Sequence, residues 1–243
     1  MKISINNLDI DYLQLGKSTN KTIIFLHGWN NLISKEKYLE LLTLLSVKFH
    51  IIAIDFPGFG LSSEPSQAWT VSDYANLVQA FIDHLKIKKY ILIGHSFGGR
   101  VATKIAAKNS KNIEKLILIA SAGVEKKSLV VKLLTFTAGV TPKFIKKIFS
   151  QHLGSADYKK TTGIMRQTFK NVINEDLRKF YPEIKVPVLL VWGQEDHTTP
   201  LNHAQIMNRA LSNSTLKIIS NGNHSIPYRN APQVAEIILQ YLS

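Results

Sequence analysis

The segment Gly94-His95-Ser96-Phe97-Gly98-Gly99 constrains the fold of this chain more than any other feature. It closes the apolar run from Tyr90 to Ile93 and opens a pattern of small residues that predicts a helix from Arg100 to Ala107. A strand that turns sharply into a helix strains the backbone at the turn. Only very small residues fit beside such a turn, and glycines stand two positions before and two positions after the serine. The segment therefore predicts an α/β fold in which Ser96 is lifted clear of the sheet.

Continuous apolar runs alternate with helical patterns along most of the chain. Runs such as Ile23–Leu26 and Ile51–Ile54 are typical of strands covered on both faces, whereas the alternation in Met1–Tyr12 predicts a hairpin. This succession predicts a mostly parallel central sheet with helices on both faces. Strands are expected near residues 2–6, 10–15, 22–26, 50–54, 90–94, 116–120, 187–192 and 215–219, and helices near 34–46, 70–86, 96–109, 201–211 and 231–242.

Residues 123–185 interrupt this succession, because they have helix-like but no strand-like patterning. We therefore expect one core domain of residues 1–122 and 186–243, with a helical cap of residues 123–185 inserted over the carboxyl edge of the sheet, where ligands bind in open α/β folds. Apolar residues between Leu129 and Phe149 alternate with lysines. This pattern leaves three uses open: a roof over the pocket, weak contact with a membrane surface, or a dimer contact.

The formal net charge of +13 is concentrated in the predicted cap, where residues 123–185 hold 13 basic and 5 acidic side chains. The lysine pairs there are not interleaved with stacking aromatic residues, and no nucleic-acid-binding module is evident. The sequence therefore favours a solvated basic surface and no nucleic-acid partner. An anionic partner is the alternative.

The chain contains no cysteine, so disulfides, thiolate metal sites and a cysteine nucleophile are excluded. Its histidines lack the spacing of metal ligands. The apolar runs are too short to span a bilayer, and the first residues lack the core of a signal peptide. We expect a soluble protein, cytoplasmic by default, monomeric or homodimeric, with no stable membrane insertion, no cofactor and no metal.

A nucleophilic serine requires a histidine to take its proton and a carboxylate to orient that histidine. Asp196 follows the predicted strand that ends at Trp192, and His224 follows the next predicted strand. These residues are our candidates for the two roles. Glu195 is the rival acid, and a helix cap before Leu201 is the structural alternative for Asp196.

Several motifs, in order along nearly the whole chain, resemble the α/β-hydrolase superfamily. The Ser96 segment is similar to its nucleophile elbow, with Gly94, His95 and Gly98 in place. The family's HG turn, its DxPGxGxS segment and its GxxDxxxP acid turn match His27-Gly28-Trp29, Asp55–Ser62 and the stretch Gly193–Pro200. Asn30-Asn31 depart from the small residues that commonly follow the HG turn, and Arg229 stands roughly where an acidic residue usually follows the histidine.

This resemblance implies that the backbone N–H groups of Trp29 and Phe97 form an oxyanion hole. The family's other acid location holds Ser121, which favours Asp196. Of the remaining polar residues near these turns, we expect His27 and His95 to have supporting roles, and Asp55 to stabilise its turn.

The expected function is a serine hydrolase, a carboxylesterase, that cleaves an ester of a small or medium acyl group through an acyl-enzyme and a Ser-His-Asp triad. The same triad would serve a C–C bond hydrolase, a lactonase, or an amidase or aminopeptidase, and the resemblance does not choose among them. A slow-turnover ligand receptor or signalling protein, with the cap as its switch, is the non-enzymatic alternative.

Overall fold

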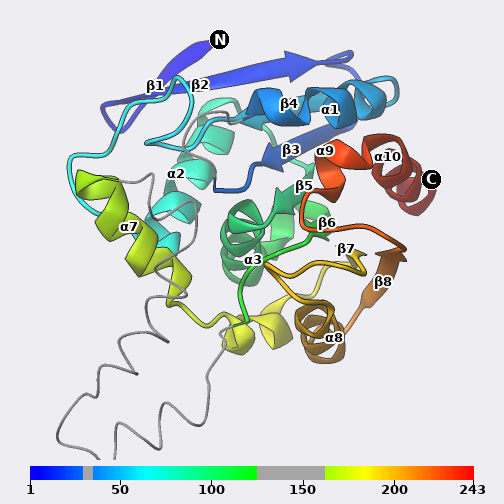
Figure 1. The fold of residues 1–243 in the computed structure, drawn as a ribbon. Helices are drawn as coiled ribbons and strands as arrows, with labels where there is room; N and C mark the ends of the chain where they lie inside the picture. Colours follow the sequence, from blue (N-terminus) through cyan, green and yellow to red (C-terminus); the bar gives the residue numbers. More distant parts are fainter. Residues whose placement is uncertain (30–34, 125–161) are drawn as a thin grey trace, which may run out of the picture.

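A computed structural model of the chain describes residues 1–29, 35–124 and 162–243. Its eight strands form one sheet in the order β1-β2-β4-β3-β5-β6-β7-β8 (Figure 1). The hairpin of β1 and β2 is antiparallel, β2 also pairs antiparallel with β4, and the remaining pairs are parallel. The strands are β1 (Lys2–Ile5), β2 (Leu8–Leu15), β3 (Thr22–Leu26), β4 (His50–Ile54), β5 (Tyr90–His95), β6 (Ile113–Ile119), β7 (Val188–Gly193) and β8 (Ser214–Ile219).

The central strands are buried on both faces, as their continuous apolar runs predict. In β3, Ile23 and Phe25 face one core, whereas Ile24 and Leu26 face the other. The alternation of side chains along a strand sends successive apolar residues to opposite faces, so a run without polar residues needs cover on both.

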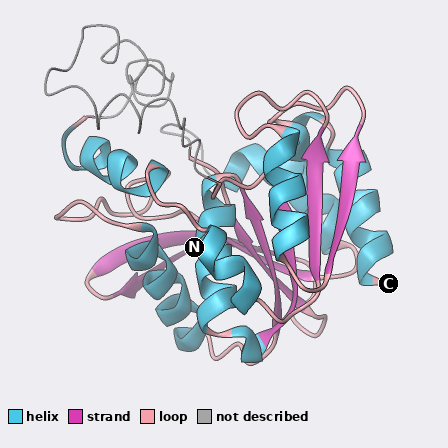
Figure 2. Cartoon of the chain, turned by 90° about the horizontal axis from the view of Figure 1, so that it is seen from below, coloured by secondary structure: helices cyan, strands magenta, loops and turns pink. Residues whose placement is uncertain are grey.

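Helices provide that cover on the two faces of the sheet (Figure 2). One core includes residues of α1 (Leu39–Ser46), α9 (Ile226–Arg229) and α10 (Ala231–Leu242). The other includes residues of α2 (Val71–His84), α3 (Phe97–Lys108) and α8 (Leu201–Ala210). The five predicted helices are therefore confirmed, although the first begins as a 3-10 helix, η1 (Lys35–Tyr38).

Two strands begin earlier than the apolar runs suggest. β2 starts at Leu8, which pairs with Ile5 of β1, and β6 starts at Ile113, which pairs with Tyr90 of β5. In β6, charged side chains at the sheet margin also find partners. Glu114 accepts a hydrogen bond from Lys21 at 3.1 Å, and the ammonium of Lys115 donates to the carbonyl of Tyr241 at 2.7 Å. Charged residues can therefore extend a strand that hydropathy alone would shorten.

The described part of the predicted cap contains α7 (Gly163–Ile173) and the 3-10 helix η3 (Arg178–Glu183). The predicted apolar surface between Leu129 and Phe149 lies outside the described residues, and the cap boundaries stay a prediction. Among the residues that the structure describes, every helix is too short or too polar to cross a membrane.

Side chains and backbone of the core hold α7 in place. The hydroxyl of Thr168 accepts a hydrogen bond from the backbone N–H of Trp69 at 3.0 Å. The guanidinium of Arg100, on α3, donates to the carbonyls of Ile173 and Glu175 at 3.2 and 2.6 Å. The two bonds from Arg100 satisfy carbonyl groups at and just after the C-terminal end of α7, where a helix leaves carbonyls without partners.

Candidate active site

Ser96 lies at a sharp turn between β5 and α3, with φ 51° and ψ −108°. This backbone conformation is costly for a residue with a side chain and persists only where the surroundings enforce it. A Cβ on Gly94 would lie 2.5 Å from the carbonyl oxygen of Gly98, and one on Gly98 would lie 2.2 Å from that of Leu26. The two glycines therefore allow the close approach of β5, α3 and β3 that produces the turn.

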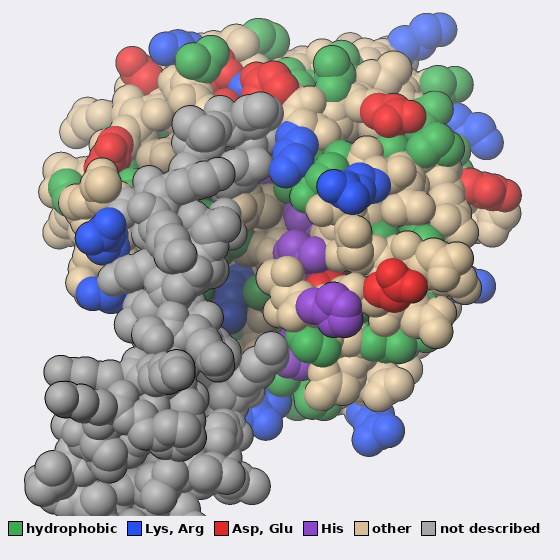
Figure 3. Space-filling view, viewed as in Figure 1, with side chains coloured by type: hydrophobic (Ala, Val, Ile, Leu, Met, Phe, Trp, Pro, Cys, Tyr) green, Lys and Arg blue, Asp and Glu red, His purple; other side chains and the backbone are tan. Residues whose placement is uncertain are grey.

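The structure brings Ser96, His224 and Asp196 together from three separate strand ends. Nε2 of His224 lies 3.0 Å from Oγ of Ser96, and Nδ1 of His224 lies 2.9 Å from Oδ2 of Asp196. A carboxylate only accepts hydrogen bonds, so Nδ1 carries the ring proton and Nε2 is free to accept one from the serine hydroxyl. Histidine side chains gather beside a hollow near the centre of the face in Figure 3.

Asp196 is held ionised by its neighbours. Its Oδ1 accepts hydrogen bonds from the backbone N–H groups of Thr198 and Thr199, both at 2.8 Å, and its Oδ2 lies 2.8 Å from the Thr199 hydroxyl. Burial favours the neutral acid, but the hydrogen bonds from His224 and Thr199 outweigh it and lower the pKa of the carboxyl. Asp196 can therefore stabilise a positively charged imidazole.

The two alternative interpretations of the acid turn, Glu195 as the acid and Asp196 as a helix cap, do not match the geometry. Glu195 is exposed, whereas Asp196 is buried and contacts the histidine. Pro200 is the N-cap of α8, and no side chain forms a capping hydrogen bond there.

The turn after β3 fixes the peptide group between Gly28 and Trp29. Nδ1 of His27 lies 2.7 Å from the carbonyl oxygen of Gly28, and Nε2 accepts a hydrogen bond from the backbone N–H of Phe56 at 3.0 Å. Burial lowers the pKa of His27, which keeps the ring neutral with its proton on Nδ1. In a trans peptide the C=O and the N–H point in opposite directions, so a fixed Gly28 carbonyl also fixes the direction of the Trp29 N–H.

Four aromatic rings, which we call the aromatic wall, pack together beside the backbone N–H groups of Trp29 and Phe97. The Trp29 ring lies at centroid distances of 4.8, 5.3 and 5.0 Å from Phe59, Phe97 and Phe169. Trp29 is partly exposed and the other three are buried. Phe169 comes from α7, so the predicted cap supplies one member of the wall. The wall offers an apolar surface through Trp29.

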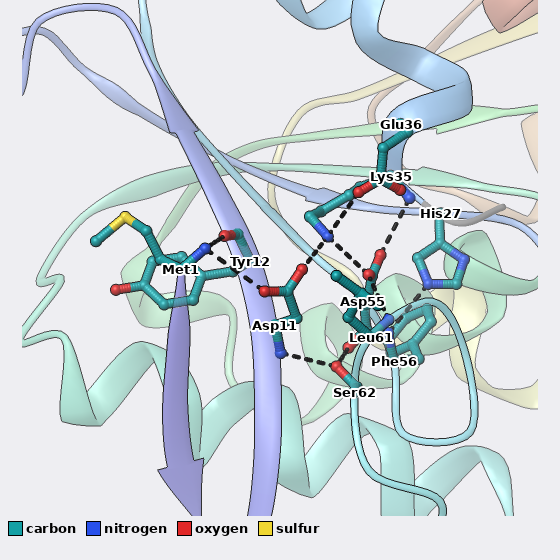
Figure 4. Close-up of polar contacts among 10 residues, drawn as sticks. All are labelled: Met1, Asp11, Tyr12, His27, Lys35, Glu36, Asp55, Phe56, Leu61 and Ser62. Carbon is teal, nitrogen blue, oxygen red and sulfur yellow. Dashed lines mark hydrogen bonds and ion pairs between the residues drawn. The ribbon is translucent and has the colours of Figure 1, made fainter.

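An ion cluster around the buried Lys35 lies beside His27 (Figure 4). The ammonium of Lys35, whose side chain is 4% exposed, pairs with Asp11, with Asp55 at 2.7 Å and with Glu36 at 3.0 Å. Burial opposes its charge, but these hydrogen bonds outweigh burial and raise the pKa of Lys35. The three carboxylates lie close enough to share a metal ion, and the Lys35 cation already pairs with each of them.

Asp55 also stabilises its own turn, as the sequence suggested. Its carboxylate accepts hydrogen bonds from the backbone N–H groups of Lys35 and Leu61, at 3.1 and 3.3 Å. Asp55 thus joins the DxPGxGxS segment to η1 and does not contact the Ser96 hydroxyl.

Sequence reasoning missed several residues that shape the site. Thr199 lies inside the predicted acid turn, where its small hydroxyl gives no separate signal. Lys35 and Tyr38 lie in a predicted helix, in which a lysine is expected at the surface and a tyrosine in the hydrophobic core. Phe169 lies in the predicted cap, whose apolar pattern does not indicate which ring turns inward.

Comparisons with known proteins agree with this fold. A model of the alpha/beta hydrolase fold matches residues 21–156 and 126–231. The chain is 24% identical to the uncharacterized hydrolase YugF of Bacillus subtilis, over 99% of this chain and 97% of that protein. It is 25% identical to the monoacylglycerol lipase abhd6-A of Xenopus laevis, over 99% and 81%. A crystal structure of a bacterial membrane phospholipase A has a TM-score of 0.80 and 25% identity, covering 100% of this chain and 84% of that one.

The matched regions span most of the chain and include both sides of the predicted cap. The chain therefore belongs to the α/β hydrolase family and is a hydrolase.

Proposed function

We propose that this protein is a serine esterase that hydrolyses carboxylic esters of small or medium apolar acyl groups. The observation that carries the proposal is the continuous hydrogen-bonded series from Ser96 through His224 to Asp196, with heavy-atom distances of 3.0 and 2.9 Å. Each bond has the length and direction that proton transfer from a serine hydroxyl requires.

In the first half of the reaction, Oγ of Ser96 attacks the ester carbonyl while Nε2 of His224 takes the hydroxyl proton. The backbone N–H groups of Trp29 and Phe97 stabilise the oxyanion of the tetrahedral intermediate. Phe97 is the first residue of α3, so the positive end of the helix dipole also stabilises this negative charge. Asp196 stabilises the imidazolium. The C–O bond then breaks, and the alcohol leaves with the proton from His224.

In the second half, His224 takes a proton from water as the water attacks the acyl-enzyme. The second tetrahedral intermediate collapses, the carboxylic acid leaves, and the proton returns to Oγ of Ser96. The cycle needs only this chain and water.

The aromatic wall and the relatives favour an ester with an apolar acyl group. Trp29 presents its partly exposed ring beside the two proposed oxyanion amides, where an acyl chain bound to Ser96 would lie. A monoacylglycerol lipase and a phospholipase A, whose names describe cleavage of lipid esters, are similar over nearly the full chain. A small-molecule ester is thus the proposed partner, and the cytoplasmic location and the oligomeric state stay predictions.

Cleavage of a lactone, an amide or an activated C–C bond would use the same three side chains. A panel of p-nitrophenyl esters, lactones, anilides and vinylogous diketones separates these reactions. We expect the highest kcat/KM on the esters, because the wall accepts an apolar acyl group. Turnover on the esters that remains fast at steady state would also exclude a slow receptor.

The direct test replaces Ser96 by alanine and measures hydrolysis of p-nitrophenyl butyrate. Ser96→Ala should lower kcat by at least about a thousandfold, because the attacking oxygen is removed. The matched control is Ser121→Ala, just after β6, whose hydroxyl donates to the neighbouring carbonyl of Ala122 at 2.9 Å. Full activity in Ser96→Ala would contradict the proposal.

A further inference from the structure

We propose that Tyr38 is a positioning residue that joins the turn before Trp29, the turn at Ser96 and the loop of His224 through one buried hydrogen-bonded chain. This inference rests on the proposed function, because its effect is exerted on the attacking serine, its base and the oxyanion amide. Tyr38 comes from η1 and matches none of the sequence motifs.

The chain has three bonds. The backbone N–H of Gly28 donates to the Tyr38 hydroxyl at 3.0 Å. The Tyr38 hydroxyl lies 2.8 Å from Nδ1 of His95, and Nε2 of His95 lies 3.0 Å from the carbonyl oxygen of His224. Gly28 precedes Trp29, and His95 precedes Ser96. The hydrogen-bonded chain therefore contacts the residue before each of these two positions, and it ends on the backbone carbonyl of His224 itself.

The direction of every bond is fixed by its two ends. The Gly28 N–H can only donate and the His224 carbonyl can only accept. A neutral His95 ring has one N–H group, so Nε2 donates to the His224 carbonyl and Nδ1 accepts. The Tyr38 hydroxyl therefore accepts a hydrogen bond from the Gly28 N–H and donates one to Nδ1 of His95. All the donors and acceptors along the chain are thereby paired, which a buried polar network requires.

Packing leaves this hydrogen-bonded chain little freedom to rearrange. Tyr38 and His95 are both buried, and their rings lie 5.6 Å apart in an edge contact. The His95 ring lies 5.0 Å from that of His224. A Cβ on Gly28 would lie 2.7 Å from Nδ1 of His95, so the HG turn approaches the chain as closely as a glycine allows.

The carbonyl and the N–H of Gly28 are thus held by different residues. His27 binds the carbonyl, as described above, and Tyr38 binds the N–H. Together they fix the backbone that presents the Trp29 amide. Loss of the Tyr38 hydroxyl would release one of these anchors, and at the same time free His95 to shift away from the His224 carbonyl. Small misplacements of reacting groups cost much of the rate of a positioned reaction.

The test compares Tyr38→Phe with Tyr90→Phe. Both substitutions remove one buried hydroxyl, but that of Tyr90, at the opposite end of β5, has no hydrogen-bond partner among the described residues. For Tyr38→Phe we expect kcat on p-nitrophenyl butyrate to fall by about tenfold while KM stays within about twofold. The second-order rate constant for inactivation by a fluorophosphonate should fall by a similar factor. Tyr90→Phe should change neither.

A second pair of variants decides the question if Tyr38→Phe fails to fold, as judged by circular dichroism. His95→Gln retains one donor and one acceptor, whereas His95→Leu retains neither. The proposal expects His95→Gln to keep more of the kcat than His95→Leu does. Equal kcat values in the two variants would overturn it.

The outcomes also separate this inference from the proposed function. If the wild-type protein does not react with the fluorophosphonate at Ser96, the proposed function fails, and this inference fails with it. If the wild-type protein reacts but Tyr38→Phe reacts at the same rate with unchanged kcat, only the inference about Tyr38 is overturned.

Discussion

Three histidines hold the candidate site together, and each keeps one tautomer because of the groups that it meets. His27 and His95 are buried and have both ring nitrogens engaged by neighbouring groups of the fold. The side chain of His224 is 21% exposed, and its Nε2 faces the Ser96 hydroxyl. Of these three rings, His224 is the one placed to exchange a proton with a substrate.

The state of His95 predicts how stability depends on pH. Burial, and to a smaller extent the nearby His224, lowers the pKa of His95 well below the ordinary value of 6.5. A proton therefore binds the unfolded chain more readily, and stability is present above pH 6.5 and lost as the pH falls. Between pH 7.5 and 5.5 the free energy of unfolding should fall by about 1 kcal/mol because of this group.

Urea unfolding of the wild-type protein and of His95→Gln at the two pH values checks this prediction. The glutamine does not titrate, so the variant should lose about 1 kcal/mol less than the wild-type protein over this interval. An equal loss in the two proteins would show that His95 binds protons similarly in the folded and unfolded states.

The glycines around Ser96 and the strand ends before Asp196 and His224 made these three residues predictable from the sequence. Their positions follow from the local rules of turns and from the rule that parallel strands end at one edge. Tyr38 and Thr199 were not predictable, because their hydrogen-bond partners are distant in sequence or are backbone atoms whose positions depend on the complete fold.

At the scale of elements, α7 connects the predicted cap to the aromatic wall. Arg100 binds carbonyl groups at the end of α7, and Phe169 on the same helix packs against Trp29. Because α7 is hydrogen-bonded to the core at both Trp69 and Arg100, we expect it to act as a fixed wall of the acyl site.

Replacing Arg100 by methionine should lower the free energy of unfolding by about 2 kcal/mol, because two carbonyl groups lose a charged donor. It should also raise KM for p-nitrophenyl hexanoate by about fivefold, the equivalent of about 1 kcal/mol of apolar contact, with little change for the acetate. Urea unfolding and a series of esters measure the two effects. Lys108→Met, at the exposed end of α3, is the control. A KM that rises equally for both esters would contradict a role of α7 in binding the acyl chain.

The strands and the principal helices were predictable because the sheet is covered on both faces, which makes its strands continuous apolar runs. The short helix α9 and the 3-10 start at η1 were not. They have too few residues to show a period, and contacts such as that between Tyr38 and Tyr228, at 5.8 Å between ring centroids, stabilise them.

At the scale of the whole molecule, the Lys35 cluster joins the first strands of the sheet to the turns of the site. It ties Asp11 on β2 and Asp55 at the end of β4 to η1, which also carries Tyr38. A buried ion cluster of this kind is costly to break, because the partners that remain keep their charge without a counter-ion.

Lys35→Met should therefore lower the free energy of unfolding by about 3–5 kcal/mol. Lys48→Met, an exposed lysine near the end of α1, should change it by less than about 0.5 kcal/mol. Thermal or urea unfolding of the two variants gives the comparison. A Lys35→Met protein as stable as the control would mean that the buried charges gain nothing from their pairing.

The central claim is that Ser96 attacks the substrate and carries the acyl group. The most direct test is to treat the protein with a fluorophosphonate and to map the modified residue by peptide mass spectrometry. The account predicts one covalent adduct per chain, on Ser96, formed in step with the loss of p-nitrophenyl butyrate hydrolysis and abolished in Ser96→Ala. Inactivation with the label on another residue, or full activity of a chain labelled at Ser96, would contradict it.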